Sequence, residues 1–77
     1  NTATVTLRAN EATTTITDSR IAFSSAIVFV PVTANAAAEL YGGTMYYANT
    51  GRTNGSLVIN HANNAQTDKT FQWAVIG

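Results

Sequence analysis

Apolar and polar residues alternate with a period of two over most of the chain, which is the pattern of half-buried β-strands. The alternating or apolar runs cover residues 4–8, 12–17, 26–32, 44–50, 56–60 and 70–76. The threonine-rich run 12–17 has one large apolar residue and is typical of an exposed or edge strand. In the run 70–76, Phe71 and Trp73 share a face with Val75, so we expect both aromatic side chains in the core. The pattern predicts six or seven strands.

The run 26–32 differs from the others because both of its faces are apolar, with Val28 and Val30 on one and Phe29 on the other. Such a strand is covered on both sides, either by a second sheet or by a neighbouring subunit. We therefore expect Val28 and Val30 in the core or in an oligomer interface, where a charge at Val30 would abolish folding or assembly. Pro31 favours an edge position, a bulge or the end of the strand.

Residues 33–40 are the only helix-like segment, with Thr33 as the expected N-cap and a run of alanines behind it. The dipeptide Asn54-Gly55 predicts a hairpin with a type I′ turn. With the strands, these signals predict an all-β fold, a small antiparallel β-sandwich of jelly-roll-like type with one short helical turn. We expect residues 1–77 to form a single domain.

The composition favours assembly and argues against several classes of partner. A chain of 77 residues without cysteine has a thin core and no disulfides, so oligomerisation is the expected source of extra burial. Its net charge is zero and 10% of its residues are charged, which argues against nucleic acid as a partner. The longest apolar run, residues 26–32, is too short for membrane insertion. One histidine and four scattered carboxylates offer no ligand spacing, so we expect no metal and no cofactor.

No catalytic set is visible in the sequence. The carboxylates Glu11, Asp18, Glu39 and Asp68 lie beside expected turns or helix ends, where caps and surface ion pairs are the usual explanation. The amide-rich loop 60–68 suits either hydrogen bonding to sugar hydroxyls or a self-capped turn. We expect a protein that is not an enzyme.

Five residues are candidates for binding a glycan. Tyr46 and Tyr47 are consecutive in an expected strand, so one should be buried and the other should offer an exposed ring for stacking. Arg52 and Asn54, in the expected hairpin, have side chains that pair with hydroxyls or acidic sugars. His61 is either a contact to a ligand or subunit, or a loop residue that bonds to the backbone at the end of a strand.

Three segments carry a resemblance to a known class of protein. They are the stretch HANNAQTD at 61–68 with the aromatic and apolar run that ends at Gly77, the stretch TANAAA at 33–38 and the stretch TDSR at 17–20. Together they resemble the C-terminal modules of tail fibres and tailspikes of tailed bacteriophages. Lys69 and Trp73 stand where this pattern more often has arginine and tyrosine.

The resemblance implies the C-terminal part of a longer virion protein, exposed outside the host cell. It implies a homotrimer about the fibre axis that serves trimerisation and binds a bacterial surface polysaccharide, without enzymatic activity. An alternative is a capsid-associated head-decoration or head-fibre protein, because small, neutral, cysteine-free β-domains serve there too.

Overall fold

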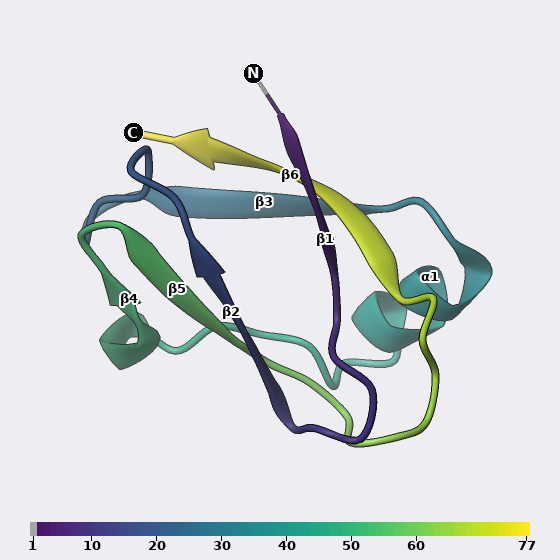
Figure 1. Ribbon diagram of the computed structural model, residues 1–77. Coiled ribbons are helices and arrows are strands. Elements are labelled where there is room, and N and C mark those ends of the chain that lie inside the picture. Colours follow the sequence, from purple (N-terminus) through teal and green to yellow (C-terminus); the bar gives the residue numbers. More distant parts are fainter. Residues whose placement is uncertain (1) are drawn as a thin grey trace.

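The computed structural model describes residues 2–77, which form six strands, one α-helix and one 3₁₀ turn (Figure 1). In chain order the elements are β1 (Ala3–Thr6), β2 (Thr13–Thr17), β3 (Ala26–Pro31), α1 (Ala34–Tyr41), η1 (Asn49–Gly51), β4 (Arg52–Thr53), β5 (Ser56–Asn60) and β6 (Thr70–Ile76). The strands form two antiparallel sheets, sheet A in the order β1-β6-β3 and sheet B in the order β2-β5-β4. The fold is therefore mostly β, as predicted, with α1 at the end where β3 stops and β6 starts.

Both sheets contribute to one apolar core. The central strand of sheet B supplies Leu57 and Ile59, which are fully buried, and the central strand of sheet A supplies Phe71 and Trp73. Phe29 meets Phe71 edge to face, with ring centroids 6.2 Å apart. The prediction that Phe71 and Trp73 lie in the core is confirmed, because the period-two alternation of β6 points both side chains toward sheet B.

Val28 and Val30 are not core residues in the isolated chain. Their side chains point away from sheet B, and the two residues are 44% and 53% exposed. Sheet A is covered on one face, and no element among residues 2–77 covers the other. The structure therefore places Val28 and Val30 outside the core of the single chain, whereas their place in an oligomer interface and the effect of a charge at Val30 on folding or assembly stay predictions. Pro31 ends β3, an edge strand, as expected.

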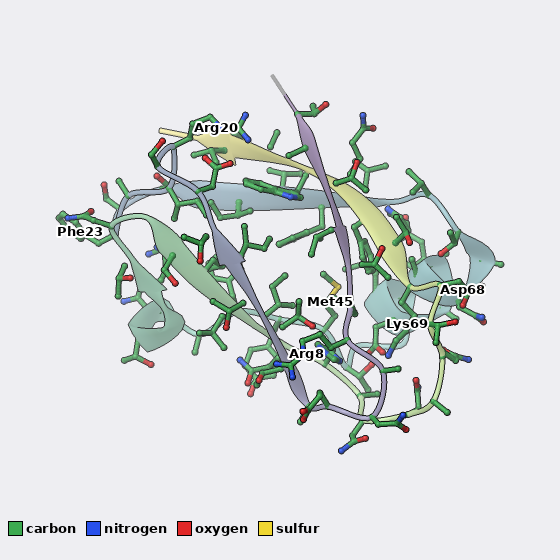
Figure 2. The ribbon with its side chains drawn as sticks, in the orientation of Figure 1. Arg8, Arg20, Phe23, Met45, Asp68 and Lys69 are labelled. Carbon is green, nitrogen blue, oxygen red and sulfur yellow. The ribbon has the colours of Figure 1, made fainter. Side chains whose placement is uncertain are left out.

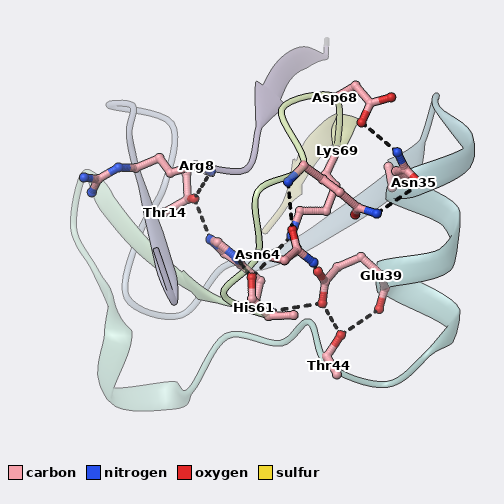
Figure 3. Close-up of polar contacts among 12 residues, drawn as sticks. Arg8, Thr14, Asn35, Glu39, Thr44, His61, Asn64, Asp68 and Lys69 are labelled. Atoms are coloured by element: carbon pink, nitrogen blue, oxygen red, sulfur yellow. Dashed lines mark hydrogen bonds and ion pairs between the residues drawn. The ribbon is translucent and has the colours of Figure 1, made fainter. Parts of the chain in front are cut away.

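Hydrogen bonds join the start of α1 to the amide-rich loop 60–68. Thr33 caps the helix as predicted, because its Oγ1 accepts a hydrogen bond from the Ala36 N–H. The same hydroxyl donates to the Asp68 carbonyl. Asn35 donates its side-chain N–H to the Asp68 carboxylate at 2.8 Å (Figure 3). The side chains of this part of the loop are engaged in contacts within the chain, which agrees with the structural interpretation of the motif.

The predicted hairpin forms between β4 and β5 and pairs Arg52 with Leu57 and Thr53 with Ser56, but its turn differs from the predicted one. A type I′ turn needs positive φ at both central residues, and of residues 2–77 only Asn10 has positive φ among the non-glycines. Gly55 does adopt φ 87°. Asn54 does not, and its side-chain oxygen instead accepts a hydrogen bond from the Phe23 N–H, so contacts with a distant loop determine this turn.

The expected strand at 44–50 is mostly absent. Tyr46 forms one isolated bridge with Asn60, and the chain then turns through η1. Gly51 lies against Val58 of β5, where an added Cβ would approach the Val58 Cβ to 3.4 Å. On this side of β5, the close approach of Gly51 takes the place of regular strand pairing at Val58.

A buried ion pair joins α1 to the segment that enters β6. Lys69 is fully buried, the Glu39 side chain is 3% exposed, and the Lys69 Nζ lies 2.9 Å from the Glu39 Oε1 (Figure 3). The ammonium also donates to the Ala62 carbonyl at 3.3 Å, and the Glu39 Oε2 accepts from the Ala62 N–H and the Thr44 hydroxyl. The expectation that Glu39 caps a helix end or forms a surface ion pair is therefore wrong.

Replacing Lys69 with methionine should destabilise the fold strongly, because the Glu39 carboxylate would stay buried without its partner. The expected loss is about 3–5 kcal/mol in the free energy of unfolding, measured by chemical denaturation at fixed protein concentration. The double variant Lys69→Met/Glu39→Gln should recover most of this loss, since a glutamine amide can bond to both backbone groups of Ala62. A single variant within about 1 kcal/mol of the parent would contradict the role assigned to the pair.

The Glu39 carboxyl should make stability depend on pH in the acid range. Burial raises the pKa of Glu39, but hydrogen bonds from Lys69, Thr44 and the Ala62 N–H outweigh burial, so this pKa lies below the ordinary value of 4.5. The stabilisation is fully present above the unfolded pKa and is lost as the pH falls through the folded pKa. Unfolding measured from about pH 6 down to about pH 3 should therefore show a smaller pH dependence for Glu39→Gln than for the parent. The exposed Glu11→Gln serves as the control, and equal slopes for the two variants would contradict this assignment.

Candidate functional site

His61 is buried and hydrogen-bonded within the fold. It is 6% exposed, and its Nδ1 lies 2.9 Å from the Ala62 carbonyl oxygen, which only accepts, so Nδ1 carries the proton. Its Nε2 then accepts from the Thr14 hydroxyl at 2.7 Å, while Thr14 accepts from the Arg8 N–H (Figure 3). Both ring nitrogens are engaged inside the fold, which agrees with the alternative of a bonded loop residue, and a glycan contact at His61 stays an untested prediction.

Of the two adjacent tyrosines, one is exposed and the other packs against the core, as predicted. Tyr46 is 61% exposed. Tyr47 packs against the core, and its hydroxyl accepts a hydrogen bond from the Ile27 N–H at 3.1 Å. The Arg52 guanidinium carbon lies 5.4 Å from the centre of the Tyr47 ring. Of the two residues, Tyr46 is therefore the more exposed one.

Arg52 and Asn54 hold a loop that the sequence had not marked as functional. Arg52 donates from Nε to the Phe23 carbonyl at 2.7 Å and from Nη2 to the Asn49 side-chain oxygen at 2.6 Å. Asn54 accepts from the Phe23 N–H at 3.0 Å. Both backbone groups of Phe23 are thus fixed, while the residue itself is 66% exposed and projects from one end of the molecule (Figure 2). A large aromatic residue among serines was the signal in the sequence.

The start of the same loop is fixed by a second cation. Arg20 donates from Nε and Nη2 to the two carboxylate oxygens of Asp18, and its guanidinium carbon lies 5.3 Å from the Trp73 ring centre. The hydrogen bonds from the Arg20 side chain and backbone hold the pKa of Asp18 at about 2. Asp18 is therefore ionised at all but strongly acidic pH, and the ion pair holds the loop that leads to Phe23.

An apolar pocket of about 280 Å³ opens beside β3. We call it the Met45 pocket, and its lining residues are Phe29, Leu40, Met45, Tyr46, Tyr47 and Ile59. The lining comes from β3, the last turn of α1, the segment before η1, and β5. No charged side chain lines it, so it suits an apolar group.

The uncovered side of sheet A forms an uncharged, largely apolar surface, which we call the outer face. Its residues are Ala26, Val28, Val30 and Val32 from β3 and the position after it, and Ala74 and Ile76 from β6. The register places Val28 opposite Ala74 and Ala26 opposite Ile76, so the apolar side chains are contiguous. Threonines of β1 and Gln72 lie beside them.

The free edge of β3 is poorly suited to pairing with another strand. The Val32 N–H bonds to the Thr70 carbonyl of the neighbouring segment, so by alternation residues 27, 29 and 31 point their backbone groups outward. The Ile27 N–H is already bonded to Tyr47, and Pro31 has no N–H. Of these three positions, only Phe29 has an N–H that is free to bond. Association through the face of sheet A is therefore easier than association through this edge.

The four carboxylates are each engaged within the chain: Glu11 with Arg8, Asp18 with Arg20, Glu39 with Lys69, and Asp68 with Asn35. No group of three or more metal-ligating side chains occurs within residues 2–77. In the same part of the chain no helix has the length and apolarity that crossing a membrane requires.

Comparisons of this chain with protein-family models, curated proteins and solved structures found no match. The resemblance to bacteriophage virion proteins therefore rests on the sequence motifs described above.

Proposed function

We propose that this chain is a non-enzymatic assembly module, a small jelly-roll-like β-sandwich that forms a trimer at the C-terminal end of a bacteriophage tail fibre or tailspike. The observation that carries the proposal is the outer face of sheet A. Three exposed valines and Ile76 lie together there on a regular sheet surface. Contiguous exposed apolar surface of this kind marks interaction sites in soluble proteins.

The size and charge of the molecule are compatible with association of identical copies. A stable interface removes about 800 Å² per partner, which is about a fifth of the 4278 Å² accessible surface of this chain. The outer face has no charged residue, so identical copies meet there without like-charge repulsion. At the free edge of β3 the Ile27 N–H is already bonded and Pro31 has no N–H. Assembly through the face of sheet A is therefore favoured over the addition of a strand at this edge.

The motifs of the sequence support a virion location, with the capsid-associated protein as the alternative. In that alternative the outer face would cover a capsid shell, and the free subunit would be a monomer. Recognition of a host glycan stays a prediction. Tyr46 supports it, because its ring is 61% exposed, whereas Tyr47, Arg52, Asn54 and His61 are engaged within the fold.

A charge on the outer face should dissociate the assembly and leave the chain folded. Sedimentation should give a trimer for the parent and a monomer for Val30→Asp, whose circular dichroism should remain that of a folded β-protein. Thr15→Asp, at an exposed position of sheet B, is the matched control and should stay trimeric. A parent that is monomeric at micromolar concentration would contradict oligomerisation and favour the capsid-associated alternative.

Glycan binding, if it occurs, should depend on Tyr46 because a sugar ring needs an exposed aromatic face. On an array of host lipopolysaccharide and capsule fragments, Tyr46→Ala should lose binding while its free energy of unfolding stays within about 1 kcal/mol of the parent. Tyr41→Ala, which removes an even more exposed ring, is the control. Unchanged binding by Tyr46→Ala would reject this residue as the stacking platform.

A further inference from the structure

We propose that Phe23 of one copy inserts into the Met45 pocket of a neighbouring copy. This inference deepens the proposed function and rests on it, since it specifies how the copies of the trimer hold one another. It assigns complementary roles to two features that the fold itself does not use: an exposed aromatic ring and an apolar pocket.

Phe23 is built as a rigid projection rather than a loose loop residue. Its N–H is held by Asn54 and its carbonyl by Arg52. Arg20 anchors the loop before it through Asp18, and Ser25 anchors the loop after it by donating to the Gly77 carbonyl at 2.8 Å. Ordering these groups before binding lowers the entropy cost of association. Five polar side chains thus hold the backbone of Phe23 and its loop in place, although the residue is 66% exposed, which folding alone does not explain.

The Met45 pocket fits a phenyl ring in size and chemistry. An apolar cavity of about 150 Å³ is known to accept benzene, and this pocket measures about 280 Å³. Its lining is entirely aliphatic, aromatic or thioether, and thioethers and aromatic edges pack well against an inserted ring. A neutral apolar side chain therefore fits it better than a charged or hydroxyl-rich ligand does.

The symmetry of a trimer favours a second copy as the occupant. In a closed ring, a surface of each copy binds a different surface of the next copy. A single self-complementary patch instead forms a dimer. Phe23 does not line the pocket of its own chain, so ring and pocket are available as such a pair. Both features lie near β3. Phe23 is three residues before the start of β3, and Phe29 of β3 lines the pocket. The outer face lies on the other side of this strand.

The inserted ring would anchor an interface that the outer face completes. One phenylalanine buries about 150–250 Å², which is well below the roughly 800 Å² per partner of a stable interface. The ring and the outer face are therefore expected to act together. Aromatic anchors in pockets commonly dominate the energetics of such interfaces.

The first experiment is sedimentation equilibrium of the full chain as parent, Phe23→Ala and Tyr41→Ala. Phe23→Ala should raise the dissociation constant of the trimer by about tenfold or more, without change in the circular dichroism spectrum. Tyr41 is 78% exposed and lies outside the pocket, so Tyr41→Ala should assemble like the parent. Phe23→Ala with unchanged assembly would overturn the inference while leaving the proposed function intact.

The second experiment observes the pocket directly through Met45, the only methionine of the chain. Copies labelled with ¹³C at the methionine methyl are mixed with unlabelled copies, and a filtered nuclear Overhauser experiment detects only contacts between copies. The Met45 methyl should show contacts to aromatic protons of the unlabelled parent, and these should vanish when the unlabelled copy carries Phe23→Leu.

The other results of these two experiments test the contact between Phe23 and Met45 and the trimer separately. A trimer without the contact between copies would overturn the inference alone. A trimer whose Met45 methyl signal shifts on addition of toluene or of a host glycan would show a pocket open to another occupant, and would also overturn it. A monomeric parent without the contact would reject both the inference and the proposed function.

Discussion

The pairing of Lys69 with Glu39 is the constraint on which much of the remaining architecture depends. It joins α1 to the segment that enters β6, and through Ala62 it reaches the loop that follows β5. Two charges in a fold this small must satisfy each other, because water cannot reach them. Their geometry therefore fixes where the helix lies relative to both central strands. The Asp68 contacts with Thr33 and Asn35 strengthen the same junction from outside.

The strands were largely predictable from sequence because alternation directly reflects which side chains face the core. The run 70–76 matches β6 in both bounds, and Thr33 caps the helix as expected. The same alternation applies to Lys69. It is at an alternate position to Phe71 and Trp73, so its side chain points inward with theirs. The pairing with Glu39 was beyond the reach of periodicity, since it joins positions thirty residues apart.

The outer face, the Met45 pocket and the contacts of Phe23 were less predictable, because they combine segments that no local pattern connects. The two-faced apolar character of β3 predicted cover on both sides, but in the single chain Val28 is 44% exposed, and a covering neighbour stays a prediction. Arg52 and Asn54 were predicted as glycan contacts, but in the structure both bond to the backbone of Phe23, about thirty residues earlier. The Met45 pocket depends on the irregular path of residues 44–50, which the sequence indicated as a strand.

The distribution of side chains separates folding from assembly. An ion pair lies inside and valines lie outside, the reverse of the usual preference, yet Leu57, Ile59 and Phe71 are already fully buried in the single chain. The core therefore does not need a neighbour to exclude water. In the proposed assembly, a charge placed on the outer face would act on association, while a change at Lys69 would act on the fold that presents that face. Because each chain completes its core alone, the proposed copies would meet with Phe23 and the Met45 pocket already formed, and their association would require little further ordering.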